Sequence, residues 1–152
     1  MILVLFFKVE ALLIIHLYSL WNHENLNEET HKNIDKYFGA SHMNTMSWLM
    51  KCGQLGTLTS NAPSRTNLAT PEGIERLKGL PILFVAGADN MAYTAENMDT
   101  SYTTLCHAHG RRWYQREVFP NMGHLDLWMG PKSCEMVYPR VRRHVEEVMG
   151  LP

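Results

Sequence analysis

Two short apolar runs, separated by enough residues for one helix, constrain the fold of this chain most strongly. Pro81–Asp89 is continuously apolar and ends in small residues and a carboxylate, whereas Trp113–Phe119 alternates and leads to the turn at Gly123 and His124. Continuous apolarity is typical of a strand buried on both faces of a parallel sheet. A helix-length connection between two strands also implies that they pair in parallel. The pattern therefore predicts an α/β fold.

Helical patterns flank and connect these two strands. Thr94 is a good N-cap for the helix between them, and Gly110 is placed to end that helix. After the His124 turn, residues 133–149 are mostly helical, and Pro139 either kinks this helix or marks its true first turn. Residues 74–152 therefore form a strand and helix succession, which we interpret as the C-terminal part of an α/β core.

The preceding region, residues 22–73, is predicted to be a helical cap or lid followed by a polar loop. Asn27 is expected to cap a first short helix that ends near Gly39, and Ser41 a second one that ends near Gly53. The second helix carries an apolar stripe, formed by Met43, Met46, Leu49 and Met50. A methionine-rich stripe suits a lid over a lipid-like ligand, but ordinary core packing is the better explanation for any single methionine. Residues 54–73 are polar and are expected to be a loop with at most a turn of helix.

Residues 1–21 are strongly apolar, but Lys8, Glu10 and His16 interrupt them. The run lacks the positive start and the small-residue cleavage site of a signal peptide, and it is too polar for an ordinary membrane span. We expect a core-packing segment, or one whose packing partners are missing, so membrane association is not favoured.

Composition bears on the size of the fold, on nucleic acid as a partner and on the state of the cysteines. The 152 residues suffice for one domain with a core, and 14 basic against 15 acidic residues, with no basic run, argue against nucleic acid as a partner. The three cysteines are odd in number and widely spaced, which predicts reduced, mostly buried thiols rather than a disulfide framework and favours the cytoplasm.

The chemistry-bearing residues follow the two predicted strands. His124 comes after the second strand and Asp89 after the first, so both are expected at the carboxyl edge of the sheet, where catalytic groups gather. An acid followed by a histidine is the chain order of the last two members of an α/β-hydrolase triad, with Asp89 orienting the imidazole and His124 acting as general base. Asp89 could instead be a turn former. Asp126 is a rival acid, expected to point away or to hold the loop through hydrogen bonds.

A nucleophile for such a triad is missing from the sequence. No Gly-x-Ser-x-Gly occurs, and Ser41 lies between predicted helices rather than on a strand-to-helix turn. The compact Cys106-His107-Ala-His109 group has no spacing typical of zinc, so no metal is predicted. No phosphate-binding loop or dinucleotide fingerprint is present either, so no cofactor is predicted.

Several short segments carry a resemblance to known families. The segment His124–Gly130, with the sequence His-Leu-Asp-Leu-Trp-Met-Gly, resembles a segment of acid lipases that contains the triad histidine. More of the chain resembles the α/β-hydrolase domain that is fused to, or accompanies, cholesterol-oxidase-like flavoproteins of the glucose-methanol-choline oxidoreductase group. The matching positions are His23–Asn27, Thr30–His31, Phe38–Gly39, Met43–Thr45, Leu80–Ile82, Gly87–Ala88, Gly123–Asp126, Val137–Pro139 and Arg143–His144.

This resemblance implies the C-terminal half of an α/β-hydrolase fold, with a helical cap and the last two strands, acting on an apolar or sterol-type ester. It implies no metal, and it gives the acid role to Asp89 and the base role to His124. The first half of the family's domain, with its nucleophile, has no counterpart here, so we expect little turnover by this chain alone. The expected partners are a small apolar ester and either the missing half or a flavoprotein domain. The alternative is a non-catalytic module that binds an apolar ligand or a partner.

Overall fold

The computed structural model describes residues 21–33, 36, 43–62, 64 and 66–150. The predicted apolar segment before Trp21 and the predicted helix signals at Gly39 and Ser41 lie outside the described residues, as do the side chains of Met43 and Met46. The described residues fall into two compact units, which divide between His31 and Lys32 and again between Leu80 and Pro81.

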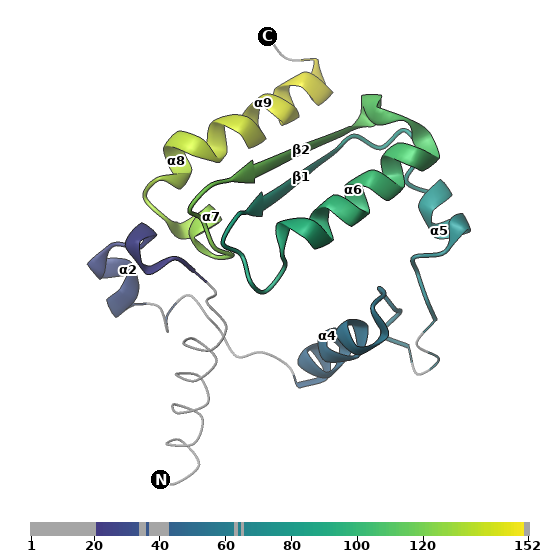
Figure 1. The fold of residues 1–152 in the computed structure, drawn as a ribbon, viewed down its shortest axis with the longest axis horizontal. Helices are drawn as coiled ribbons and strands as arrows, with labels where there is room; N and C mark the ends of the chain where they lie inside the picture. The colour runs from purple at the N-terminus through teal and green to yellow at the C-terminus, as the bar shows by residue number, and fades with distance from the viewer. Residues whose placement is uncertain (1–20, 34–35, 37–42, 63, 65, 151–152) are drawn as a thin grey trace, which may run out of the picture. The chain divides into compact units, whose positions relative to one another are not determined.

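The larger unit is a mixed α/β structure around a two-stranded parallel sheet, so the coarse prediction of an α/β fold is confirmed (Figure 1). It contains the 3-10 helix η1 (His23–Asn25), α2 (Glu28–Lys32, whose last residue crosses the boundary), β1 (Ile82–Gly87), α6 (Ala95–His109), η2 (Arg111–Trp113), β2 (Tyr114–Phe119), α7 (Asp126–Met129), α8 (Ser133–Met136) and α9 (Tyr138–Met149). The smaller unit contains α4 (Met43–Leu55) and α5 (Pro71–Glu75).

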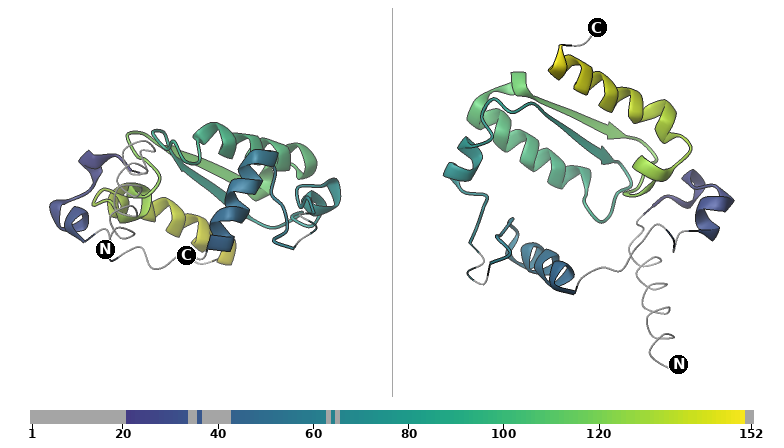
Figure 2. Two further views of the ribbon diagram at one scale, coloured as in Figure 1. Left: turned by 90° about the horizontal axis from the view of Figure 1, so that it is seen from below. Right: turned by 180° about the vertical axis from the view of Figure 1, so that it is seen from behind.

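Strands β1 and β2 pair in register from Ile82 opposite Tyr114 to Gly87 opposite Phe119. Helices α6 and α9 lie on opposite sides of the two strands (Figure 2, left). The contacts agree with this arrangement. On one face, the rings of Phe84 on β1 and Tyr102 on α6 lie 6.1 Å apart. On the other, Gln115 of β2 donates to Glu147 of α9 at 3.0 Å. Successive side chains of a strand point to opposite faces, and this alternation separates the two helices.

Strand β1 is less buried than its sequence predicts. Ile82–Val85 are only partly covered, although Ala86 and Gly87 are buried. Among the described residues, β1 pairs with β2 alone, so its other edge has no neighbouring strand. The continuously apolar sequence suits a strand with neighbours on both sides. Because β1 has a neighbour on one side here, its apolar residues are only partly covered.

The apolar core of the larger unit lies where the chain leaves β2. It consists of Phe119, Met122, Leu127 and Val137, each at most 6% exposed, with Val85, Met136 and Val141 packed against it. Full burial of one valine, leucine, methionine or phenylalanine side chain contributes about 1.5–3 kcal/mol to stability. The first turn of α9 therefore anchors that helix, whereas Val145 and Val148, farther along the predicted valine stripe, are about half exposed.

The predicted helix caps are confirmed where the structure describes them. The side chain of Asn27 accepts a hydrogen bond from Thr30 N at 2.7 Å, and Thr94 accepts one from Asn97 N at 3.3 Å. Gly110 follows α6 with a φ of 82°. Pro139 lies in the first turn of α9, where its missing N–H costs no helical hydrogen bond, so it marks a helix start and not a kink.

In the smaller unit, the predicted polar loop has more structure than expected. Helix α4 continues to Leu55, Thr59 forms an antiparallel bridge with Asn67, and Trp48 Nε1 donates to the carbonyl of the buried Thr59 at 2.8 Å. Helix α5 begins at Pro71 and is the short turn of helix that was expected at most within residues 54–73. On α4, Met50 is 66% exposed, so it does not contribute to a core within this unit.

Candidate functional site

The two strand ends bring two loops side by side at the carboxyl edge of the sheet. Because β1 and β2 end in register, the chain leaves both at the same level. Ala88 N donates to the Phe119 carbonyl at 2.8 Å, and Asp89 N donates to the Met122 carbonyl at 2.9 Å. Gly87 permits this approach, since a Cβ there would lie 2.1 Å from the Met122 oxygen. The loops after β1 and β2 are therefore joined by their backbones.

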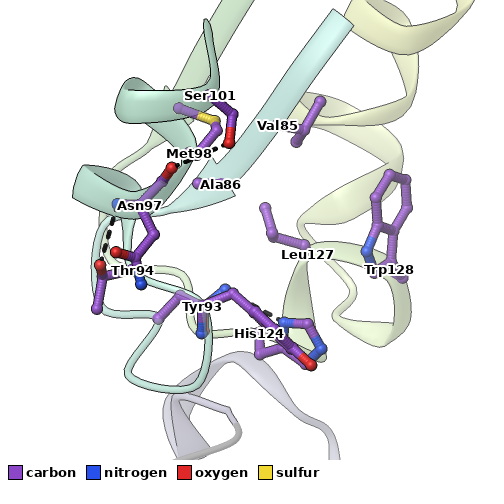
Figure 3. A pocket seen from close by; sticks show the side chains of 11 residues that line it. Val85, Ala86, Tyr93, Thr94, Asn97, Met98, Ser101, His124, Leu127 and Trp128 are labelled. Atoms are coloured by element: carbon purple, nitrogen blue, oxygen red, sulfur yellow. Dashed lines mark hydrogen bonds between the residues drawn. The ribbon is translucent and has the colours of Figure 1, made fainter. Parts of the chain in front are cut away.

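His124 lies in the second of these loops and lines a pocket of about 280 Å³. Its Nδ1 lies 3.2 Å from Asn90 Nδ2, and its ring lies 5.2 Å from the ring of Tyr93 (Figure 3). Burial lowers the pKa of His124 below its ordinary value of 6.5, against the opposing effect of the Asp126 carboxylate. The structure thus places a mostly neutral imidazole at the pocket wall near neutral pH.

The pocket at His124 is lined by β1, the loop after it, α6 and α7. Its apolar side chains come from both sides, and Figure 3 shows Val85 and Ala86 of β1 facing Leu127 and Trp128 of α7 across it. The remaining lining residues are Asn90, Tyr93, Thr94, Asn97, Met98, Ser101 and His124. The pocket is therefore mainly apolar along the strand, with its polar groups near His124 and on α6.

Asp89, the predicted acid, is exposed and lies in the loop next to that of His124. Within the described residues, no hydrogen bond or ion pair joins its carboxylate to His124. Asp89 instead lines a second pocket, of about 430 Å³, together with Trp21, Asn22, His23, Glu24 and Met91. The structure thus brings the two predicted loops together, and its contacts leave the proposed acid role of Asp89 a prediction.

Asn90, which the sequence did not single out, forms the hydrogen bond to the His124 imidazole. It is 6% exposed, and its Oδ1 accepts hydrogen bonds from Ala92 N at 3.1 Å and Tyr93 N at 3.0 Å. Asparagine commonly bonds to its own backbone two residues on, so a turn was foreseeable at this position. Which of two adjacent side chains faces the neighbouring loop depends on the turn's conformation, and spacing alone does not reveal it.

Asp126 holds the histidine loop, as the sequence analysis expected of this rival acid. It is fully buried, and both carboxylate oxygens accept from Gly123 N, at 2.9 and 3.0 Å. Asn25 Nδ2 donates to it at 2.8 Å and Asn22 N at 3.3 Å. Asn25 is itself buried and accepts from Lys132 Nζ at 3.1 Å. We call Asn22, Asn25, Gly123, Asp126 and Lys132 the loop clasp, because they join the η1 segment to the His124 turn.

Within the described part of the chain, no hydroxyl group forms a hydrogen bond with the His124 ring, so none is paired with it as a nucleophile would be with its base. Thr94 Oγ1 caps α6, and Ser101 Oγ donates to the Asn97 carbonyl at 3.4 Å. Figure 3 shows Ser101 on α6, at the end of the pocket away from His124. Tyr93 contacts the imidazole through its ring. The pocket therefore has a binding wall, and its described residues supply no serine paired with a base.

The histidine, cysteine and acidic side chains form no metal-binding cluster in the described ranges. Among the residues that the structure describes, no three histidine, cysteine or acidic side chains gather as metal ligands. None of the three cysteines, all within the described ranges, forms a disulfide. Cys52 and Cys106 are partly buried and Cys134 is exposed, so the prediction of mostly buried thiols is wrong. Cys134 lies on α8, and its thiol donates to the Pro131 carbonyl at the surface.

Comparisons with family models, curated proteins and solved structures found no match to this chain. Of the helices in the described ranges, none is both long and apolar enough to cross a membrane.

Proposed function

We propose that this chain binds a small, mainly apolar carbonyl compound, such as an ester, in the pocket beside His124, and that it does not turn the compound over by itself. The observation that carries this proposal is the surroundings of the imidazole. His124 faces an apolar pocket at the carboxyl edge of a parallel strand pair, and an amide rather than a carboxylate contacts its Nδ1.

The surroundings of His124 support binding better than catalysis. Removal of the nucleophile from a serine triad leaves only the weak residual catalysis that binding and oxyanion donors provide. An asparagine in place of the orienting acid also favours the wrong imidazole tautomer, which costs about four orders of magnitude in kcat in a serine protease. Here the sequence lacks the serine motif, and the described contacts of His124 lack the acid.

The relation to the α/β-hydrolase fold belongs to the same proposal. The chain would correspond to the helical cap and the last strands of such a domain, in which the final strand ends at the histidine. The parallel pairing of β1 with β2, and the helices on both sides of the pair, support this relation. Among the residues that the structure describes, no strand lies at the far edge of β1, and a preceding strand of a larger sheet would pair there.

The binding proposal is tested with p-nitrophenyl butyrate as a chromogenic ester and with 4-phenyl-2-butanone, a small aryl ketone that cannot be hydrolysed, as a ligand. We expect the ketone to perturb amide signals of the residues that line the pocket, and to quench or enhance Trp128 fluorescence. His124→Ala should weaken binding, whereas the matched variant His107→Ala, which removes an exposed histidine from α6, should not. Ester hydrolysis should equal the buffer rate in all three proteins.

Two outcomes would overturn this proposal. Ketone binding that leaves the pocket signals unchanged would place the ligand elsewhere. Ester hydrolysis that depends on His124 would show that the chain is an enzyme on its own.

A second candidate function is the acid and base half of a serine α/β hydrolase, completed by another polypeptide that carries the serine. The contact between Asp89 N and the Met122 carbonyl at 2.9 Å favours it, because it places the acidic residue in the loop next to that of His124. Reconstitution with a hydrolase half that contains a Gly-x-Ser-x-Gly turn should then give esterase activity that His124→Ala and Asp89→Asn both abolish. Activity that survives both substitutions would exclude this candidate.

A further inference from the structure

We propose that Asn90 fixes His124 in the neutral tautomer with its proton on Nε2, so that the pocket offers a hydrogen-bond donor and selects ligands with a carbonyl or carboxylate oxygen. This inference deepens the proposed function and rests on it for the ligand. The tautomer itself can be measured without any ligand.

The first step is the orientation of the Asn90 amide. Its oxygen faces two backbone donors, Ala92 N at 3.1 Å and Tyr93 N at 3.0 Å. A flipped amide would direct its NH₂ group at both donors and lose both hydrogen bonds. Asn90 is also buried, so water cannot replace the lost partners at low cost. The NH₂ group of Asn90 must therefore be the part that faces His124.

The second step follows from the imidazole. An amide NH₂ group only donates, so the ring nitrogen that it faces at 3.2 Å must accept. In a neutral imidazole one nitrogen accepts and the other carries the proton. His124 Nδ1 is therefore unprotonated, and Nε2–H is the donor that remains. A triad base needs the opposite tautomer, with Nδ1–H donating to an acid and Nε2 accepting the nucleophile's proton.

The third step is that nearby charge does not reverse this tautomer. The Asp126 carboxylate is the acidic group that acts on His124, but its oxygens accept from Gly123, Asn25 and Asn22. Protonation of Nδ1 would place an N–H against the Asn90 NH₂ group. The Asn90 NH₂ group therefore disfavours protonation of Nδ1, and the pKa of His124 is indeed lowered.

The fourth step concerns the ligand. An N–H donor on the His124 ring, next to the apolar side chains of β1 and α7, rewards a molecule that carries an oxygen acceptor on an apolar body. An isosteric molecule without the acceptor would leave the donor unpaired on binding, and a buried unpaired donor typically reduces affinity about fivefold or more. The pocket should therefore discriminate between a ketone and the alkene of the same shape.

The tautomer is tested by NMR on the protein labelled with ¹⁵N in its histidine side chains. The His124 signals, assigned by their absence in His124→Gln, should show a protonated Nε2 and an unprotonated Nδ1. Asn90→Asp keeps an oxygen for the two backbone donors and presents a second oxygen to Nδ1. We expect it to move the proton to Nδ1 and to raise the His124 pKa. Predominant Nδ1–H in the unmodified protein would overturn the inference, as would an Asp89→Asn substitution that changes the tautomer.

The ligand class is tested with acetophenone and α-methylstyrene, which differ in C=O against C=CH₂. Acetophenone should bind at least about fivefold more tightly, and this preference should disappear in His124→Leu and in Asn90→Asp. Equal affinities, with the Nε2–H tautomer present, would overturn the ligand assignment alone. Failure of both compounds to bind would overturn the proposed function, while the NMR result would still decide the role of Asn90.

Discussion

Removal of the buried Asp126 carboxylate should destabilise the larger unit strongly, because the loop clasp depends on it. Asp126 is 0% exposed and accepts from a buried backbone N–H, Gly123, and from the buried Asn25 side chain. In Asp126→Ala these donors lose a charged acceptor inside the protein. Asn25 keeps a hydrogen bond to the Asn121 carbonyl, so the loss is greatest for Gly123.

The magnitude follows from the two strongest contacts. A hydrogen bond to a charged group contributes about 1.5–3 kcal/mol, and an unsatisfied buried donor costs about 1–3 kcal/mol. Part of this is offset because burial of the carboxylate is itself unfavourable. We expect Asp126→Ala to lower the free energy of unfolding by about 3 kcal/mol, which for a protein of this size lowers Tm by about 6–12 °C.

Urea unfolding followed by circular dichroism measures the global effect, and amide hydrogen exchange at Gly123 measures the local one. The control is Glu146→Ala, which removes a carboxylate paired with the exposed Arg142 and should cost at most about 0.5 kcal/mol. A loss of less than about 1 kcal/mol in Asp126→Ala, with Gly123 exchange unchanged, would refute this account of the clasp. Fast exchange at Gly123 with unchanged global stability would mean that the clasp opens locally.

Three further predictions concern the strand end, the α6 cap and pH. Gly87→Ala should destabilise the protein by several kcal/mol in thermal unfolding, because the added Cβ would meet the Met122 carbonyl. The control Gly53→Ala adds its Cβ to open space on α4 and should stabilise the protein by about 0.5–1 kcal/mol. Thr94→Ala should cost about 1 kcal/mol in urea unfolding through loss of the α6 cap; an unchanged midpoint would contradict that role. The pKa of His124 is lowered in the folded state, so the unfolded chain binds the proton more readily. The free energy of unfolding should therefore fall as the pH drops below about 6.5. This fall should be steeper in the unmodified protein than in His124→Gln. Equal slopes in the two proteins would contradict this.

Features set by local chemistry could be predicted from the sequence. The caps at Asn27 and Thr94, the end of α6 at Gly110 and the start of α9 near Pro139 each depend on neighbouring residues. The parallel pairing followed from the helix-length connection between two apolar runs. His124 was found at the carboxyl edge for the same reason, since a turn after a strand of a parallel sheet must lie there.

Features set by contacts between distant segments could not be predicted. Nothing in the sequence indicates that Asn25 meets Asp126, because the two lie 101 positions apart. The choice between Asp89 and Asn90 as the partner of the imidazole depends on how one turn directs two adjacent side chains. The half-covered state of β1 depends on which strands are present to pair with it.

The separation between the two sides of the loop clasp has a consequence for the newly made chain. Trp21 and Leu26, both buried in the finished unit, leave the ribosome long before the residues around Asp126 are made. At about 5–20 residues per second, the 101 residues from Leu26 to Asp126 take roughly 5–20 s to synthesise. During that interval Asn25, which lies between Trp21 and Leu26, lacks its acceptor Asp126, so the η1 segment takes its final place only after the His124 loop has been made.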